Sequence, residues 1–243
     1  MREELCGSLL LIANDRYQIG CTGQTVYLLD ASGNELAKFK DMPYAYDPAF
    51  HPSGEIAAVY GNTGMMAVYA LSERRLIAKF RVSAASDAQT DRVPCFSPDG
   101  SCLYHIEGRK GDRLNSRLSV YSTADYQPVL RLFEKEPKNV FECMEFDGET
   151  LFLLGYFRKE DGNDYFVTQL LGESLQNVKP LDRDTYDFYQ SAMRVKQAGF
   201  TREAFKWSAL SFMPAEMGAS HREYTLDDLK RMKPSLARLW EEI

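Results

Sequence analysis

Two short stretches decide the fold of this chain: Phe50-His51-Pro52-Ser53-Gly54 and, 46 residues later, Phe96-Ser97-Pro98-Asp99-Gly100. In both, the proline presets one backbone angle of a turn, and the Ser-Gly or Asp-Gly pair supplies the positive φ that a tight hairpin needs. Three short strand-like segments follow each turn. They are Ile56–Tyr60, Ala67–Leu71 and Leu76–Phe80 in one copy, and Cys102–Ile106, Leu118–Ser122 and Val129–Phe133 in the other. The chain is therefore predicted to repeat a small antiparallel sheet.

Two weaker copies flank this pair. One begins at Phe146-Asp147-Gly148-Glu149 and ends near Leu181, and the other begins at Leu9, with Asn14-Asp15 in place of the turn motif. Equivalent valines, Val26, Val68 and Val120, are 42 and 52 residues apart. Four-stranded units at this spacing indicate the blades of a β-propeller. A β-sandwich is the competing all-β arrangement, but the in-phase recurrence of the turn favours the propeller.

The two turns, together with the Val-Tyr pairs Val68-Tyr69 and Val120-Tyr121, resemble WD40-like β-propeller repeats. The resemblance covers about residues 8–181, with two good copies and two degraded ones. No copy carries the Trp-Asp pair or the Gly-His pair of a full WD40 repeat, so the hydrogen-bonded tetrad of that family is not expected. The resemblance implies a fold and no functional residue.

The composition changes after Leu181, because residues 182–243 hold two of the 16 glycines and both tryptophans. Apolar spacing predicts a helix that Asp184 or Thr185 caps and that ends near Gly199. Further helices are expected from Thr201 to Pro214, from Thr225 onward, and from Ser235 to Glu242.

The predicted fold is mostly β: a four-bladed or incomplete WD40-like β-propeller over residues 1–181, followed by an α-helical extension over residues 182–243. The first part has room for four blades of about 45 residues, the lower limit for propellers. It therefore forms either a small closed ring or an open propeller. The open side of the latter would be covered by the helices or by another subunit, and a homodimer is one such arrangement.

Composition excludes several classes of protein. The chain has 243 residues, of which 44% are hydrophobic and 26% charged, and a net charge of -6, so a soluble globular protein is expected and nucleic acid is a poor partner. No apolar run reaches the roughly 18 residues of a membrane-spanning helix, so no membrane association is expected. The five cysteines are thinly spread, which favours reduced thiols and a cytoplasmic location.

Catalytic and metal-binding patterns are scarce. The chain has no Gly-x-Ser-x-Gly elbow, no Gly-x-x-x-x-Gly-Lys phosphate loop and no His-Glu-x-x-His pair. Cys95, Cys102 and His105 have a zinc-like spacing, but strand alternation separates Cys102 from His105 and no fourth ligand matches. His51 is expected to be a solvated turn residue. We therefore predict no catalytic residue, no metal and no cofactor.

The inter-strand loops are the remaining candidates for a site. The loop Lys40–Asp47 carries two tyrosines, a residue type enriched at interface hot spots, and Arg109, Lys110, Arg113 and Arg117 would give the third blade a basic tip. The predicted partner-binding residues are Tyr44, Tyr46, Arg109, Lys110 and Arg113. The competing interpretation is that the tyrosines pack between blades and that the tip is a solvated hairpin.

The predicted function is a non-enzymatic protein–protein interaction module or scaffold, whose partner is another protein of unknown identity. The alternative is a small-ligand-binding or hydrolytic propeller. It would use acidic loop residues, Asp47, Asp87 and Asp91, at a central channel.

Overall fold

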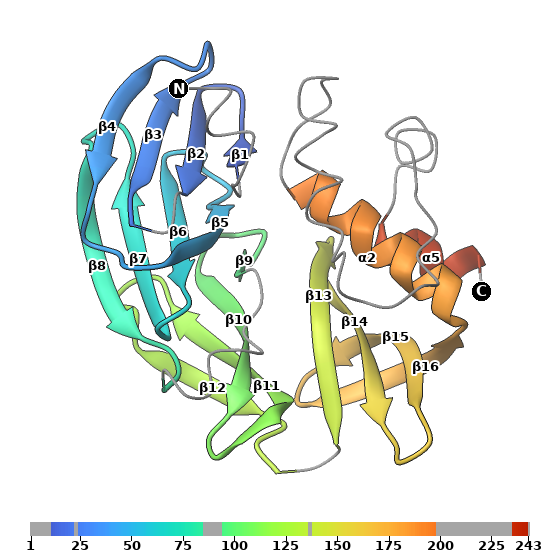
Figure 1. The fold of residues 1–243 in the computed structure, drawn as a ribbon. Coiled ribbons are helices and arrows are strands. Elements are labelled where there is room, and N and C mark those ends of the chain that lie inside the picture. Colours follow the sequence, from blue (N-terminus) through green and yellow to red (C-terminus); the bar gives the residue numbers. More distant parts are fainter. Residues whose placement is uncertain (1–10, 22–23, 85–93, 136–137, 198–234, 243) are drawn as a thin grey trace. The chain divides into compact units, whose positions relative to one another are not determined.

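The computed structural model describes residues 11–21, 24–84, 94–135, 138–197 and 235–242. Within these ranges the chain forms four four-stranded sheets, each with its strands in chain order and antiparallel to their neighbours (Figure 1). The first two sheets comprise β1 (Leu11–Ala13), β2 (Tyr17–Cys21), β3 (Val26–Asp30) and β4 (Glu35–Phe39), then β5 (Ala45–Phe50), β6 (Ile56–Gly61), β7 (Met65–Ala70) and β8 (Arg75–Arg81). The third comprises β9 (Cys95–Phe96), β10 (Cys102–Arg109), β11 (Asp112–Ser122) and β12 (Pro128–Leu132), and the fourth β13 (Asn139–Asp147), β14 (Thr150–Arg158), β15 (Asn163–Leu171) and β16 (Ser174–Leu181). Two helices follow, α2 (Arg183–Gln197) and α5 (Leu236–Glu242).

The Phe-x-Pro-x-Gly motif forms the same turn in the second and third sheets. The glycine amide donates to the carbonyl three residues back, Gly54 to His51 at 2.8 Å and Gly100 to Ser97 at 2.9 Å. Both glycines have positive φ, 70° and 75°, a conformation that only glycine adopts without strain. The predicted turn chemistry is confirmed.

These turns are also hydrogen-bonded from one sheet to the next. The Asn14 side-chain amide donates to the Gly54 carbonyl at 3.2 Å, and His51 Nε2 lies 3.1 Å from the Gly100 carbonyl. Because the Ser53 amide donates to His51 Nδ1 at 3.1 Å, Nε2 is the nitrogen that carries the proton and donates to Gly100. The expectation that His51 is merely solvated is wrong, since its ring connects two adjacent turns.

Alternation along the strands decides which residues join neighbouring sheets. Tyr69 stacks on Phe39 of the first sheet at 4.4 Å between ring centroids, whereas Val68, next to it in β7, faces the third sheet. The core between the second and third sheets contains Ala58, Tyr60, Met66, Val68, Val82, Phe96, Leu103 and Tyr121. Each of these three sheets is thus apolar on the face that meets its neighbour, as blades of a propeller require.

The fourth sheet is covered by helices on one face. Phe152, four residues after the turn glycine Gly148, corresponds to Ala58, which lies four residues after Gly54 and faces the next sheet. In the fourth sheet this position packs instead in one core with the two helices. The members of that core are Cys143, Phe152, Leu154, Val167, Tyr186, Phe188, Tyr189, Met193, Leu236 and Leu239. Helices α2 and α5 therefore occupy the face on which a further blade would pack.

The chain divides into two compact units, Met1–Phe141 and Glu142–Ile243. The division falls inside β13, so the fourth sheet belongs mainly with α2 and α5. Strands end at Leu181 and the helix begins at Arg183, but the division into domains 1–181 and 182–243 stays a prediction.

Some predicted local details were wrong. The expected loop Glu107–Arg117 is mostly strand, because β10 continues to Arg109 and β11 starts at Asp112. Helix α2 is capped by Asp182, whose carboxylate accepts from the Thr185 amide at 2.9 Å, and not by Asp184 or Thr185. The helices expected from Thr201 and Thr225 lie outside the described residues. In the described part of the chain, no helix is long and apolar enough to cross a membrane.

Candidate functional site

Tyr44 and Tyr46 lie on the surface, with 54% and 39% of their area exposed. Tyr46 belongs to β5, so the predicted loop Lys40–Asp47 ends earlier than expected, and Tyr44 precedes the strand. Tyr44 is in the left-handed region, at φ 53°, and its carbonyl accepts from the Asn62 amide at 2.9 Å. The competing interpretation, that both rings pack between blades, does not fit these exposures.

A buried anchor fixes this loop beneath the two tyrosines. Met42 is fully buried, and its methyl carbon and the Pro43 carbonyl would each lie 3.0 Å from a Cβ added at Gly61, so the loop packs tightly against this glycine. The Lys79 ammonium donates to the Asp41 carbonyl, and the Tyr69 hydroxyl lies 3.5 Å from the Asp41 carboxylate. A left-handed non-glycine residue costs about 1–2 kcal/mol, which these contacts offset. The loop therefore presents Tyr44 from a fixed backbone. Its role in binding a partner stays a prediction.

The third-blade hairpin differs from its predicted form. Its turn is Lys110-Gly111, and Lys110 is exposed, but Arg109 retains only 2% exposure. Arg109 donates to the carbonyls of Ser116 and Lys135, at 3.0 and 2.6 Å, and to the Asn139 side chain at 2.9 Å. Arg109 therefore does not lie at an exposed basic tip as expected, because these acceptors hold it inside, and its role in binding a partner stays a prediction.

The hairpin backbone includes Arg113, but its side chain lies outside the described residues. Lys110 and Arg113 remain predicted partner-binding residues. No finding tests that role.

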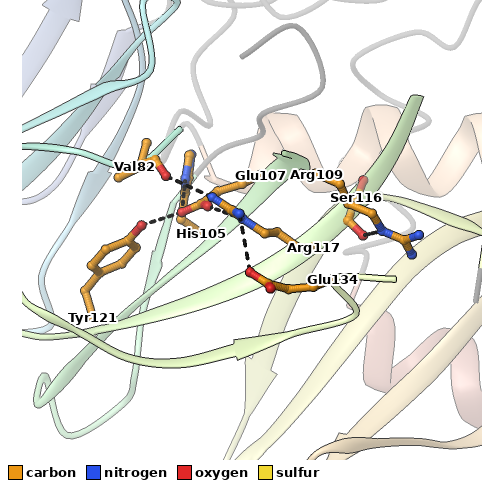
Figure 2. Close-up of polar contacts among 8 residues, drawn as sticks. All are labelled: Val82, His105, Glu107, Arg109, Ser116, Arg117, Tyr121 and Glu134. Atoms are coloured by element: carbon orange, nitrogen blue, oxygen red, sulfur yellow. Dashed lines mark hydrogen bonds and ion pairs between the residues drawn. The ribbon is translucent and has the colours of Figure 1, made fainter. Parts of the chain in front are cut away.

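Arg117 lies at the centre of a buried polar cluster that the sequence did not predict, and Figure 2 shows its contacts. Its guanidinium donates to Glu107 at 2.7 Å and to the Val82 carbonyl at 3.2 Å, and it approaches Glu134 at 3.4 Å. The Tyr121 hydroxyl donates to the other Glu107 oxygen at 2.5 Å. Glu107 is fully buried, and a buried carboxylate needs an opposite charge beside it. Arg117, on the facing strand β11, supplies that charge.

His105 completes the cluster against the second sheet. Its ring is fully buried, and the ring centroids of His105 and Tyr60 are 4.9 Å apart. His105 Nδ1 lies 3.6 Å from Glu107 Oε1, and the two side chains form an ion pair when the imidazole is protonated. Among the described residues, neither ring nitrogen has a hydrogen-bond partner. Cys102 is half-buried and, as predicted, alternation separates it from His105.

Burial and pairing act in opposite directions on the Glu107 carboxyl. Burial raises its pKa, but His105, Arg117 and Tyr121 stabilise the carboxylate enough to hold the pKa below its usual range. Burial and the Glu107 charge raise the pKa of Tyr121, so its hydroxyl stays a donor. The Glu107 charge is thus compensated by Arg117 and Tyr121, and Arg117 also connects the third sheet to the Val82 carbonyl after β8.

The predicted acidic site cannot be assembled from the described residues. Asp47 is half-buried, whereas Asp87 and Asp91 lie outside them. No group of three or more His, Cys, Asp or Glu side chains in the described ranges could hold a metal ion.

Solved structures with the same kind of fold exist, although no family model and no curated protein matches this chain. Hydrazine synthase from Kuenenia stuttgartiensis superposes with a TM-score of 0.53 at 15% identity, covering 70% of this chain and 51% of that one. The WD40 domain of Toxoplasma gondii coronin gives 0.52 at 11% identity, covering 70% and 44%. This chain therefore spans about half the length of these similar chains, and the likeness shows a WD40-like β-propeller fold.

Proposed function

We propose that this chain is a protein-interaction module whose docking surface is centred on Tyr44 and Tyr46. The observation that carries the proposal is the exposure of these two aromatic rings on a backbone fixed by Met42 and Asn62. Two rotatable angles place a large amphipathic ring, so a tyrosine on a fixed backbone gains contact area with little loss of entropy.

The WD40-like fold supports this proposal, because blades present loops from a rigid scaffold. The sequence contains none of the catalytic motifs considered above, and this also favours a binding role. Tyrosines are enriched among interface hot spots, where truncation costs about 2 kcal/mol or more. Loss of both rings should therefore weaken binding by at least about tenfold.

Site-specific photocrosslinking tests the proposal. A photoreactive phenylalanine analogue replaces Tyr44 in the whole chain, and adducts from a cell lysate are identified by mass spectrometry. The control position is Val129 on β12, which is 60% exposed and lies on an outer strand. We expect one dominant partner from position 44 and none from position 129.

The double variant Tyr44→Ala with Tyr46→Ala then tests the affinity for that partner. We expect a loss of about tenfold or more, whereas Val129→Ala leaves binding unchanged. Because both rings are exposed, circular dichroism of the double variant should match the wild type. Equal binding by the double variant and the wild type would rule the surface out.

A further inference from the structure

Helix α5 is a short segment that depends on the surface beneath it. It has seven residues, Leu236–Glu242, and residues 198–235 join it to α2. A helix of this length is not stable alone in water, because its few hydrogen bonds do not offset the cost of nucleation. It packs on β14 and β15 and shares one core with β13 and α2, all within the unit Glu142–Ile243. We call the surface that α5 covers the α5 site.

The contact of α5 with this site follows the pattern of an amphipathic helix. Leu236 and Leu239 are fully buried and Trp240 is half-buried, whereas Arg238 and Glu241 are exposed. Positions i, i+3 and i+4 lie on one side of a helix, so the two leucines and the tryptophan form its apolar edge. Short helices of partner proteins are commonly recognised through such an edge.

Two charged side chains of the fourth sheet bind the backbone of α5 at its two ends. Glu145 of β13 accepts from the Leu236 amide at 2.9 Å, and Lys179 of β16 donates to the Trp240 carbonyl. The first amides of a helix carry partial positive charge and its last carbonyls partial negative charge, so both contacts have the favourable sign. Every helix of this length and direction offers the same two groups. The α5 site therefore recognises a helix as such, and not only the side chains of α5.

Side-chain contacts add a preference at two positions. The Lys179 ammonium lies 4.2 Å from the centroid of the Trp240 ring, which favours an aromatic residue there. The Tyr189 hydroxyl of α2 donates to the Glu242 carboxylate at 2.6 Å. The preferred ligand thus has leucine at its first and fourth positions, an aromatic residue at the fifth and a carboxylate at the seventh.

We propose that the α5 site binds an amphipathic helix of a partner protein with this pattern, and that α5 is its tethered competitor in the free chain. The site is a second interaction surface, separate from Tyr44 and Tyr46. A partner helix suits it better than a second copy of this chain does. The α5 of a second copy makes the same contacts as the chain's own α5 but lacks the gain of covalent attachment. A longer partner helix adds contacts that α5 does not make.

Displacement of α5 in the whole chain tests the proposal. The variant Trp207→Phe leaves Trp240 as the single tryptophan. The added peptide is Ser-Leu-Ala-Arg-Leu-Phe-Glu-Glu-Ile, which is residues 235–243 with phenylalanine in place of tryptophan. Attachment acts as an effective concentration of the order of 1 mM, so a saturable red shift of the Trp240 fluorescence is expected with a midpoint of about 1 mM. The control peptide, Ser-Arg-Ala-Leu-Glu-Phe-Leu-Glu-Ile, has the same composition without the apolar edge and should cause no shift.

A second measurement removes the competitor. Fluorescence anisotropy with the labelled peptide compares the wild type with the full-length variant Leu239→Ala with Trp240→Ala, in which α5 has lost two anchors. The peptide should bind this variant at least about tenfold more tightly. In the same background Lys179→Ala should weaken binding about fivefold or more, because the contact with the helix carbonyl is lost. Lys159→Ala, at an exposed lysine paired with Asp164, is the matched control and should change binding less than about twofold.

Four results would overturn the proposal. They are no Trp240 shift up to about 5 mM peptide, an equal shift with the control peptide, equal affinity of the wild type and the variant that lacks the α5 anchors, and a dimer of the wild type that this variant cannot form. The last result would assign the α5 site to a second copy. The displacement experiment retains every residue of the site, so it decides the matter even where the anchor variant does not fold.

Discussion

Replacing Gly100 by alanine should break the connection between the turns of the second and third sheets. A Cβ at this position would lie 2.1 Å from His51 Nε2, so the imidazole must leave, and φ is 75°. The left-handed conformation costs about 1–2 kcal/mol, and loss of the His51–Gly100 hydrogen bond costs about 0.5–1.5 kcal/mol. His51 also loses its edge contact with Phe96, at 5.1 Å between centroids, worth about 0.5–1.5 kcal/mol. The expected loss of unfolding free energy is about 2–5 kcal/mol.

Gly111→Ala is the matched control for this experiment. Gly111 has φ 73°, but nothing lies within 4 Å of an added Cβ, so only the backbone cost of about 1–2 kcal/mol applies. Urea unfolding followed by circular dichroism measures both variants. In a His51→Ala background the cost of Gly100→Ala should fall to that of Gly111→Ala. Equal costs of the two glycine substitutions in the wild-type background would refute the reasoning.

Three further predictions concern the buried cluster and the helices. Tyr121→Phe removes a hydrogen bond to the buried Glu107 carboxylate and should lower the free energy of unfolding in urea by about 1.5–3 kcal/mol. Glu134→Gln, at a side chain that is 51% exposed, should lower it by less than about 1 kcal/mol. Similar losses in the two variants would contradict the argument that burial strengthens the Tyr121–Glu107 hydrogen bond. The folded-state pKa of Glu107 is depressed, so its contribution is present above pH 4.5 and is lost as pH falls through the folded pKa. The urea midpoint should therefore drop on acidification, and less so in Glu107→Gln; identical pH profiles would exclude this group. Leu239→Ala, at a fully buried position of α5, should lower the free energy of unfolding by about 2–4 kcal/mol and shift the fluorescence of Trp240 to the red. An unchanged spectrum would mean that the packing of α5 does not depend on Leu239.

The blades could be predicted from the sequence because their turn residues act locally. The positive φ of Gly54 and Gly100 is a requirement of a single turn. Proline and then serine or aspartate precede the glycine in both turns and favour the same turn conformation. The motif can therefore be located from a few consecutive residues. Alternation within each strand then predicts its buried face. The exposure of Tyr44 and Tyr46 was compatible with the sequence but not decided by it, since a tyrosine packs equally well in a blade interface.

The charged cluster could not be predicted because its partners are distant in sequence. Glu107 and Arg117 are ten residues apart and directly opposite only in the observed register of β10 and β11. Arg109 donates to Asn139, which is 30 residues away, so no local pattern indicates that its side chain is buried. A search for opposite charges at equivalent positions of an expected hairpin would have found the Glu107–Arg117 pair.

Amide hydrogen exchange tests the central claim most directly, because it locates the docking surface without altering the chain. The measurement compares the free protein with its complex with the partner crosslinked at position 44. Slower exchange is predicted at residues 40–47, which carry the two tyrosines, and at 61–64, which bond to that loop, with no change at 72–75 and 98–101. Protection confined to 72–75 or 98–101 would contradict the assignment of the tyrosine-bearing loop as the interaction surface.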